Sequence, residues 1–301
     1  MPFKKIYSAI VIGSGAGSAS LVDTLINNGT PPEDILVLER GVFPDQYSNT
    51  SAAERFIKFY ENSGTLPCLG NPIIPYGVAN CVGGGPEING SLIWKTPEHI
   101  KDDWFTNYNL PFKKNKFNFF LERFEEILKV KSSTITQDHD YSSFLLNKAA
   151  KALKINCVPA RRAITSHCCS DNLCAFGSIN GTKNTVYQMI FKSHLNIGLK
   201  ILSNIRNINF HILKKDGPYE IEFLHSKKLI RLRTKQIYLS AGSVNSPALL
   251  SRILGKRFHR FKLKFHLNLK SIGLLQEELP DVPGTMFSAQ VQEYKSDNQY
   301  I

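Results

Sequence analysis

The stretch "VIGSGAGSAS", residues 11–20, decides the fold of this chain. An apolar run that starts at Ile6 leads into it and has the composition of a short strand buried on both faces. Behind it, apolar residues recur at helical spacing until Gly29, and a second apolar run, residues 35–38, ends at Glu39. This order of strand, glycine turn, helix, strand and acid predicts an α/β unit that binds a dinucleotide.

Each residue of this motif has a chemical reason for its position. Gly13 permits a tight turn, and Gly15 lets the backbone approach a pyrophosphate, which the N-terminus of the following helix also attracts. Glu39 comes at the distance along the chain where an acid accepts hydrogen bonds from a ribose. Ser18 stands where the third glycine is expected, and a serine is small enough to weaken the motif without abolishing it. An α/β unit that has lost its ligand is the alternative.

The overall composition is that of an ordinary globular protein, with 301 residues, 42% of them apolar and 21% charged. A formal net charge of +12 favours anionic partners such as a phosphate-bearing cofactor, nucleic acid or an acidic membrane face, or it reflects only the base composition of the coding DNA. No segment approaches the roughly 18 apolar residues of a membrane span, so we expect a soluble cytoplasmic protein. Six cysteines are too few to staple a chain of this size, which agrees with a reducing compartment.

A second glycine-rich stretch, "CVGGGPEINGSLIW" at residues 81–94, narrows the dinucleotide to one kind. Together with "ILVLERG" at 35–41 and "QIYLSAGSVNSPALL" at 236–250, it resembles the glucose–methanol–choline (GMC) family of flavin-dependent oxidoreductases. The resemblance implies FAD as the cofactor, with its pyrophosphate at the first glycine turn and its flavin ring near the second. It also implies oxidation of a CH–OH donor by hydride transfer to the flavin. The implied fold is α/β, a Rossmann-like FAD/NAD(P)-binding fold with inserted segments and the beginning of a second, α+β substrate domain.

The resemblance also implies roles for residues of the three stretches. The first turn would cover the phosphates and Glu39 would hold the ribose, while the second turn would pass the flavin and the third would pack against FAD. The implied cofactor-binding residues are Gly13, Ser14, Gly15, Ala16, Glu39, Gly83, Gly84, Asn89, Gly90, Ser91, Ala241 and Gly242. A backbone contact with adenine is expected near Asn207. Pro86 and Glu87 depart from the family's pattern, and since a carboxylate is unfavourable near phosphates, we expect Glu87 to point to solvent or to weaken binding.

The third stretch predicts its own local structure. Residues 237–239 have the composition of a strand, and Pro247 fits the first turn of a helix that runs through Leu250. Further strands are expected at 199–202 and 219–224.

Two other segments show regular patterns without visible chemistry. Between residues 117 and 128, an aromatic and apolar stripe predicts a helix that packs the inserted segment against the flavin-binding part. Residues 260–270 alternate as a half-buried strand with a basic outer face, and no nucleic-acid motif accompanies them.

A cysteine-containing segment, residues 167–185, raises the question of a metal. Cys168, Cys169 and Cys174 lack the C-x2-C spacing that suits zinc or an iron–sulfur cluster, so we expect no metal and favour structural thiols or a disulfide. Lys183 matches a position of the family and is a candidate contact for phosphate or substrate.

The resemblance also suggests domain boundaries. We expect a FAD-binding domain at 1–100 and 166–255, an inserted helical segment at 101–165, and the start of a truncated substrate domain at 256–301. Members of the family are considerably longer, and the His that takes the hydroxyl proton lies in their C-terminal half. We therefore assign no catalytic residue, and His266 lies in the wrong region for that role.

The chain is thus expected to be the FAD-binding part of an oxidoreductase without its catalytic His. The expected partners are a small-molecule alcohol and an unidentified electron acceptor, with no nucleic acid. Three alternatives remain open: a split subunit whose partner chain supplies the missing part, a non-catalytic remnant, and a nicotinamide-binding reductase that would use the first turn alone.

Overall fold

A computed structural model describes residues 3–108, 110–137, 140–165, 173–177, 182–212, 217–254, 263–265, 273–274, 276 and 287–292. The chain forms two compact units, Met1–Ile88 with Ile190–Leu279, and Asn89–Met189 with Pro280–Ile301. These limits differ from the divisions expected after residues 100, 165 and 255, because the chain from Asn89 to Met189 makes its contacts within the second unit. Which unit serves which function stays a prediction.

The first unit is built on a six-stranded sheet. Its strands are β1 (Tyr7–Ile12), β2 (Ile35–Leu38), β8 (Lys200–Leu202), β9 (Arg206–Ile212), β10 (Tyr219–His225) and β11 (Lys228–Leu239). In space they follow the order β8-β2-β1-β11-β10-β9. Strands β8, β2, β1 and β11 pair in parallel, whereas β10 pairs antiparallel with both β11 and β9. Ile10 at the centre lies in register with Leu36 on one side and Ile237 on the other.

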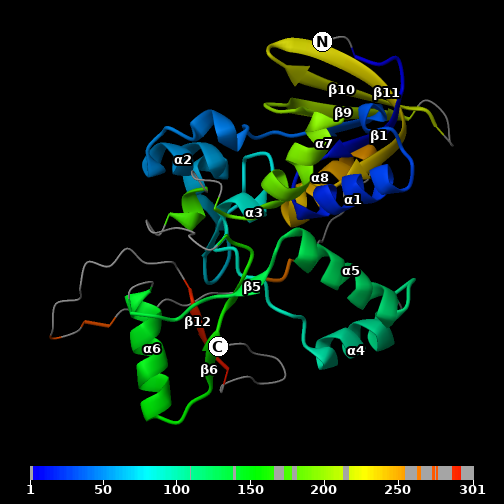
Figure 1. The fold of residues 1–301 in the computed structure, drawn as a ribbon. Coiled ribbons are helices and arrows are strands. Elements are labelled where there is room, and N and C mark those ends of the chain that lie inside the picture. The colour runs from blue at the N-terminus through cyan, green and yellow to red at the C-terminus, as the bar shows by residue number, and fades with distance from the viewer. Residues whose placement is uncertain are drawn as a thin grey trace. The chain divides into compact units, whose positions relative to one another are not determined.

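Helices accompany this sheet in the first unit, with α1 and α8 beside the strands (Figure 1). The helices are α1 (Ala16–Asn27), α2 (Ala52–Phe59), α3 (Gly85–Ile88), α7 (Lys192–Asn196) and α8 (Gly242–Ile253), and a small hairpin joins β3 (Leu66–Cys68) to β4 (Ile74–Tyr76). Among the described residues, no helix combines the length and the apolar character that a membrane crossing requires.

Burial explains why the apolar runs of the sequence become strands. All four residues of β2 are buried, as are five of the six residues of β1, so neither strand has a solvent face. Side chains of β1, β2, β10 and β11 share one core cluster, against which Leu249 of α8 packs. The expected α/β fold is confirmed, and its strand, glycine turn, helix and strand all lie where the sequence predicts them.

The start of α8 corrects one expectation. Pro247 lies inside the helix rather than in its first turn, because α8 begins at Gly242 directly behind β11. The Gly242 backbone has a φ of +81°, a conformation that glycine adopts readily, and the Ser246 hydroxyl accepts a hydrogen bond from the Ala241 N–H at 2.9 Å. The helix therefore starts on the turn itself, and the proline is accommodated further along.

The second unit consists of helices and short strand pairs. Its elements are α4 (Glu98–Asn107), α5 (Lys114–Ile127), α6 (Tyr141–Ala152), β5 (Lys131–Ser132), β6 (Cys157–Pro159), β7 (Arg161–Arg162) and β12 (Ala289–Val291). The aromatic stripe of α5 was expected to pack toward the flavin-binding part. Its described ring contacts join Phe117 to Trp104 and Phe105 of α4 within the second unit, and packing against the flavin-binding part stays a prediction.

A buried carboxylate fixes the β12 segment to α6. Asp140 is 5% exposed; its Oδ1 accepts the Ser143 N–H at 3.0 Å as the N-cap of α6, and its Oδ2 accepts the Ser288 N–H at 3.2 Å. Ser288 in turn accepts the Ala160 N–H at 2.8 Å beside the β6–β12 pair. One side chain therefore supports both the helix and the strand pair of this unit.

We predict that Asp140→Ala lowers the free energy of unfolding by about 2 kcal/mol, because it removes a helix cap and an acceptor for a buried N–H. Asp140→Asn keeps an oxygen for the cap and should lose less. Ser51→Ala is the matched control, since Ser51 caps α2 and makes no such second link, and about 1 kcal/mol is expected for it. Urea unfolding followed by circular dichroism measures all three, and equal losses for Asp140→Ala and Ser51→Ala would show that Asp140 acts only as a cap.

Candidate functional site

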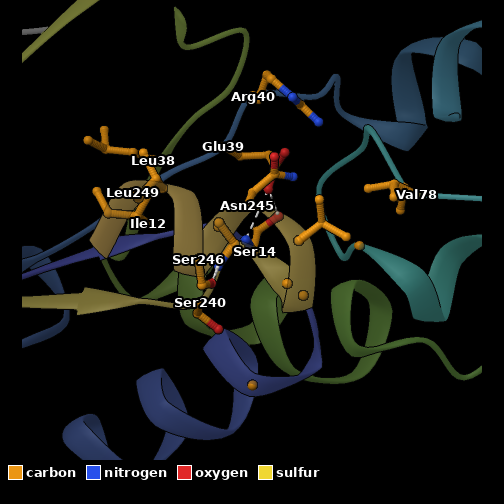
Figure 2. A pocket seen from close by; sticks show the side chains of 18 of the residues that line it. Ile12, Ser14, Leu38, Glu39, Arg40, Val78, Ser240, Asn245, Ser246 and Leu249 are labelled. Atoms are coloured by element: carbon orange, nitrogen blue, oxygen red, sulfur yellow. Dashed lines mark hydrogen bonds between the residues drawn. The ribbon is translucent and has the colours of Figure 1, made fainter. Parts of the chain in front are cut away.

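A cavity of about 940 Å³ opens in the first unit, at the carboxyl ends of the parallel strands. Residues that follow β1, β2 and β11 line it, together with the second glycine turn at Gly84 (Figure 2). Strand β1 has β2 on one side and β11 on the other, and open α/β sheets bind their ligands in the crevice outside the carboxyl ends of their strands. The volume lies at the upper end of the range of roughly 300–1,000 Å³ for small-molecule sites.

Two glycines allow the turns around this cavity to touch backbone to backbone. Gly13 has a φ of +96°, and a Cβ there would lie 2.3 Å from the Ser240 carbonyl oxygen behind β11. Gly84 has a φ of +63°, and a Cβ there would lie 2.7 Å from the Gly15 Cα. Any side chain at either position would separate the turns, so the three glycine stretches of the sequence form one structure.

The N-terminus of α1, at the first glycine turn, is suited to bind an anion. Gly15 is the N-cap, so no side chain caps the helix, and its first turn contains no acidic residue. A Cβ at Gly15 would meet no atom within 4 Å, which means that the backbone here faces open space. Uncapped N–H groups and the positive end of the helix dipole are suited to a phosphate.

Glu39 binds the first glycine turn through a buried hydrogen-bond network. Its Oε2 accepts the Ser14 N–H at 3.0 Å and the Ser14 hydroxyl at 2.7 Å, and its Oε1 accepts the Gly41 N–H at 2.7 Å. The Ser14 hydroxyl also accepts the Gly83 N–H at 3.1 Å. Figure 2 shows the Glu39 and Ser14 side chains directed at each other. One carboxylate therefore ties the end of β2 to both glycine turns.

The second glycine turn corrects the expectation for Glu87. This side chain is 3% exposed rather than directed to solvent, and it folds back so that a Cβ at Gly83 would lie 2.4 Å from its Oε1. Glu87 does not line the cavity, so its charge does not face the space where phosphates are expected. Nearby, burial raises the pKa of the Tyr60 phenol, whose hydroxyl donates to the Ile88 carbonyl at 3.3 Å.

Arginines contribute positive charge that the sequence did not single out. Arg40, Arg206 and Arg252 line the cavity. Arg40 forms a two-pronged ion pair with Glu61, in which Nη1 lies 2.7 Å from Oε1, and Arg206 donates to the Arg40 carbonyl. Arg40 could have been found from its place next to Glu39, whereas the other two are brought in by the fold.

Most of the residues expected at the cofactor line the cavity. Asn207 lines the cavity with a φ of +52°. The Gly83 N–H belongs to the network behind the cavity wall. The cavity wall itself contains eight of the expected residues, namely Gly13, Ser14, Gly15, Ala16, Glu39, Gly84, Ala241 and Gly242.

Asn89, Gly90 and Ser91 belong to the second unit, so their place near a flavin ring stays a prediction. The Asn89 carbonyl accepts the Lys183 ammonium at 2.7 Å, and the Gly90 carbonyl accepts Arg162 at 3.1 Å. Lys183 is fully buried and also donates to the Cys174 carbonyl at 3.0 Å, so its described role is to hold the backbone of this unit.

Cysteines and histidines form no metal site in the part of the chain that the structure describes, where no group of three or more potential ligands occurs. The described cysteines, Cys68, Cys81, Cys157 and Cys174, form no disulfide with one another. Cys168, Cys169 and His266 lie outside the described residues, as does most of the alternating segment 260–270.

Comparison with known proteins agrees with this geometry. The family model described as GMC oxidoreductase matches residues 56–268. An uncharacterized GMC-type oxidoreductase, y4nJ of Sinorhizobium fredii, is 25% identical over 274 residues, 89% of this chain and 53% of its own length. A long-chain-alcohol oxidase of Arabidopsis thaliana, FAO3, is 26% identical over 83% of this chain and 35% of its own length. The chain thus spans about half, or less, of the curated relatives it matches.

Solved structures show the same fold. Pyridoxine 4-oxidase from Mesorbium loti aligns with 81% of this chain and 51% of its own, at a TM-score of 0.58 and 14% identity. A formate oxidase aligns with 83% of this chain and 48% of its own, at a TM-score of 0.57 and 11% identity. At this level of identity the likeness concerns the fold alone.

We predict that Gly84→Ala destabilises the first unit by about 2–4 kcal/mol, since it puts a Cβ into the Gly15 backbone and forces an L-residue to a positive φ. Gly85→Ala is the control, because a Cβ at the next residue meets no atom within 4 Å. Thermal and urea unfolding of the two variants compare them directly. Equal stability of both variants would mean that the two glycine turns do not touch.

Proposed function

Because the chain belongs to the GMC oxidoreductase family, we propose that its first unit binds FAD and serves the oxidation of an alcohol carbon. The observation that carries the proposal is the cavity in which three glycine turns and Glu39 come together within one unit. The proposal extends to substrate and acceptor only as classes, a small-molecule alcohol and an electron acceptor. Long-chain-alcohol oxidases among the relatives support an alcohol.

The residues of the cavity fit the parts of FAD in a definite order. The uncapped start of α1 and the open space at Gly15 suit the diphosphate, since backbone N–H groups and the helix dipole stabilise negative charge there. Glu39 offers a carboxylate oxygen to the adenosine ribose, and Asn207 lies on the cavity wall where an adenine contact is proposed.

When bound, FAD supplies the chemistry by accepting a hydride from the substrate carbon. The residues of this chain would bind the nucleotide, hold its diphosphate at the start of α1 and fix the Glu39 carboxylate that faces the ribose. The proton of the alcohol is assigned to no described residue. A partner chain that supplies further parts of the active site belongs to the proposal, and co-purification of a second polypeptide would support it.

A nicotinamide-binding reductase is less well supported. Such a protein would need only the first turn, whereas here Gly84 of the second turn packs on Gly15 and the Gly83 N–H is bound to Ser14. The contact between the two turns therefore supports a flavin site over one that uses the first turn alone.

The proposal predicts that the purified chain takes up FAD and keeps it through desalting, with absorption bands shifted from those of free flavin. Titration with FAD, FMN and NADH should rank FAD first, because FMN lacks the adenosine that Glu39 would hold. A chain that is colourless after FAD has been added and unbound FAD removed by desalting would contradict the proposal. Tighter binding of NADH than of FAD would favour the reductase.

Gly15→Ala separates binding from folding. The backbone at Gly15 has a φ of −74°, which alanine adopts easily, and the new methyl group meets no protein atom. We predict an unchanged melting temperature but at least tenfold weaker FAD binding, because the methyl group occupies the approach to the diphosphate. Gly70→Ala, on the exposed β3–β4 hairpin and away from the cavity wall, is the control and should bind FAD normally.

A further inference from the structure

The acceptor capacity of Glu39 is largely used by the protein itself. A carboxylate has two oxygens, each with about two acceptor positions. Oε2 receives two donors from Ser14, its N–H at 3.0 Å and its hydroxyl at 2.7 Å. Oε1 receives the Gly41 N–H at 2.7 Å and keeps one position. Donors from the described residues thus take three of the four positions and leave one for a ligand.

The bonds to Oε2 cannot be given up easily. The Ser14 hydroxyl accepts the Gly83 N–H at 3.1 Å, so its own proton is directed to the carboxylate. A hydroxyl that donates to a carboxylate forms one of the stronger hydrogen bonds in proteins. Ser14 is 1% exposed and Glu39 is 8% exposed, so water does not replace a broken bond at low cost.

The backbone also holds Glu39 in place on both sides. Its N–H donates to the Leu202 carbonyl at 2.8 Å, and its carbonyl accepts the Ile205 N–H at 3.0 Å. The backbone of residue 39 is therefore fixed, and the orientation of the carboxylate depends on its own hydrogen bonds, including the one from the Ser14 hydroxyl.

We propose that Ser14 is a positioning residue that fills Oε2 of Glu39 and leaves Oε1 to bind a single hydroxyl of the adenosine ribose. This inference rests on the proposed function, since it concerns the adenosine half of the same site. It assigns to the Ser14 side chain a role at the ribose, through Glu39. It also makes Glu39 unequal toward the 2′- and 3′-hydroxyls, which a carboxylate with two free oxygens would bind together.

The test uses equilibrium binding of ADP, 2′-deoxy-ADP and 3′-deoxy-ADP to the full chain, measured by calorimetry. No flavin and no activity are required. We expect the loss of one hydroxyl to weaken binding at least tenfold, as is typical of a hydrogen bond to a charged group, and the loss of the other to change it less than twofold. Equal losses for both analogues, or no loss for either, would overturn the inference while ADP binding upholds the proposed function. No binding of ADP or FAD would overturn both.

Variants then assign the difference to Ser14. In Ser14→Ala the tenfold preference should fall to within twofold, because one acceptor position of Oε2 becomes available and the carboxylate loses the hydroxyl that orients it, while the backbone N–H at position 14 still donates to Oε2. Glu39→Gln should remove the preference as well, and the double variant should lose no more than either single one, since Ser14 acts through Glu39. Ser20→Ala is the control, because this serine lies in α1, one turn after its first residue, and donates to the Ala16 carbonyl at 2.8 Å. A preference that survives in Ser14→Ala would overturn the role of Ser14, and the analogue comparison in the unaltered chain remains decisive if that variant does not fold.

Discussion

The hydrogen bond between the Ser14 hydroxyl and the Glu39 carboxylate is the interaction on which the cavity of the first unit depends. It joins the end of β1 to the end of β2, and the Gly83 N–H extends it to the second glycine turn. All of these groups are buried, so each needs a protein partner, and the network provides one for each. The cavity wall is therefore fixed by polar bonds as well as by the apolar core beneath it.

Close backbone contacts complete what the network begins. Gly13 lies against the turn behind β11, and Gly84 lies against Gly15. At Gly13 a side chain would separate the ends of β1 and β11, and at Gly84 it would separate the two glycine turns. The turns thus meet at one site, and the open space at Gly15 then remains for a ligand. Substitution of Gly13 is therefore expected to disturb the fold, whereas substitution of Gly15 in the same motif is expected to disturb ligand binding.

The sequence predicted most of the first unit because its signals are local. β2 was placed at its observed limits from four apolar residues in a row, and α1 followed from periodicity and the glycine beyond its end. The failures concern features that depend on distant parts of the chain. Glu87 is buried because Gly83 leaves room for it, and Pro247 lies inside α8 because the helix begins on the turn behind β11. The bond between Ser14 and Gly83 spans 69 positions, and no periodicity or spacing could reveal it.

The parallel pairing of β1 and β11 also bears on how the chain is made. Tyr7 pairs with Thr234, so the central strand acquires its second neighbour only when nearly the whole described length has left the ribosome. Until then β1, with five of its six residues destined for burial, has an unpaired edge on that side. Pairing between such distant segments is slow to form, and an unpaired apolar edge favours association with other chains. During synthesis, the strand that later forms the centre of the sheet is therefore exposed to association with other chains until β11 has been made.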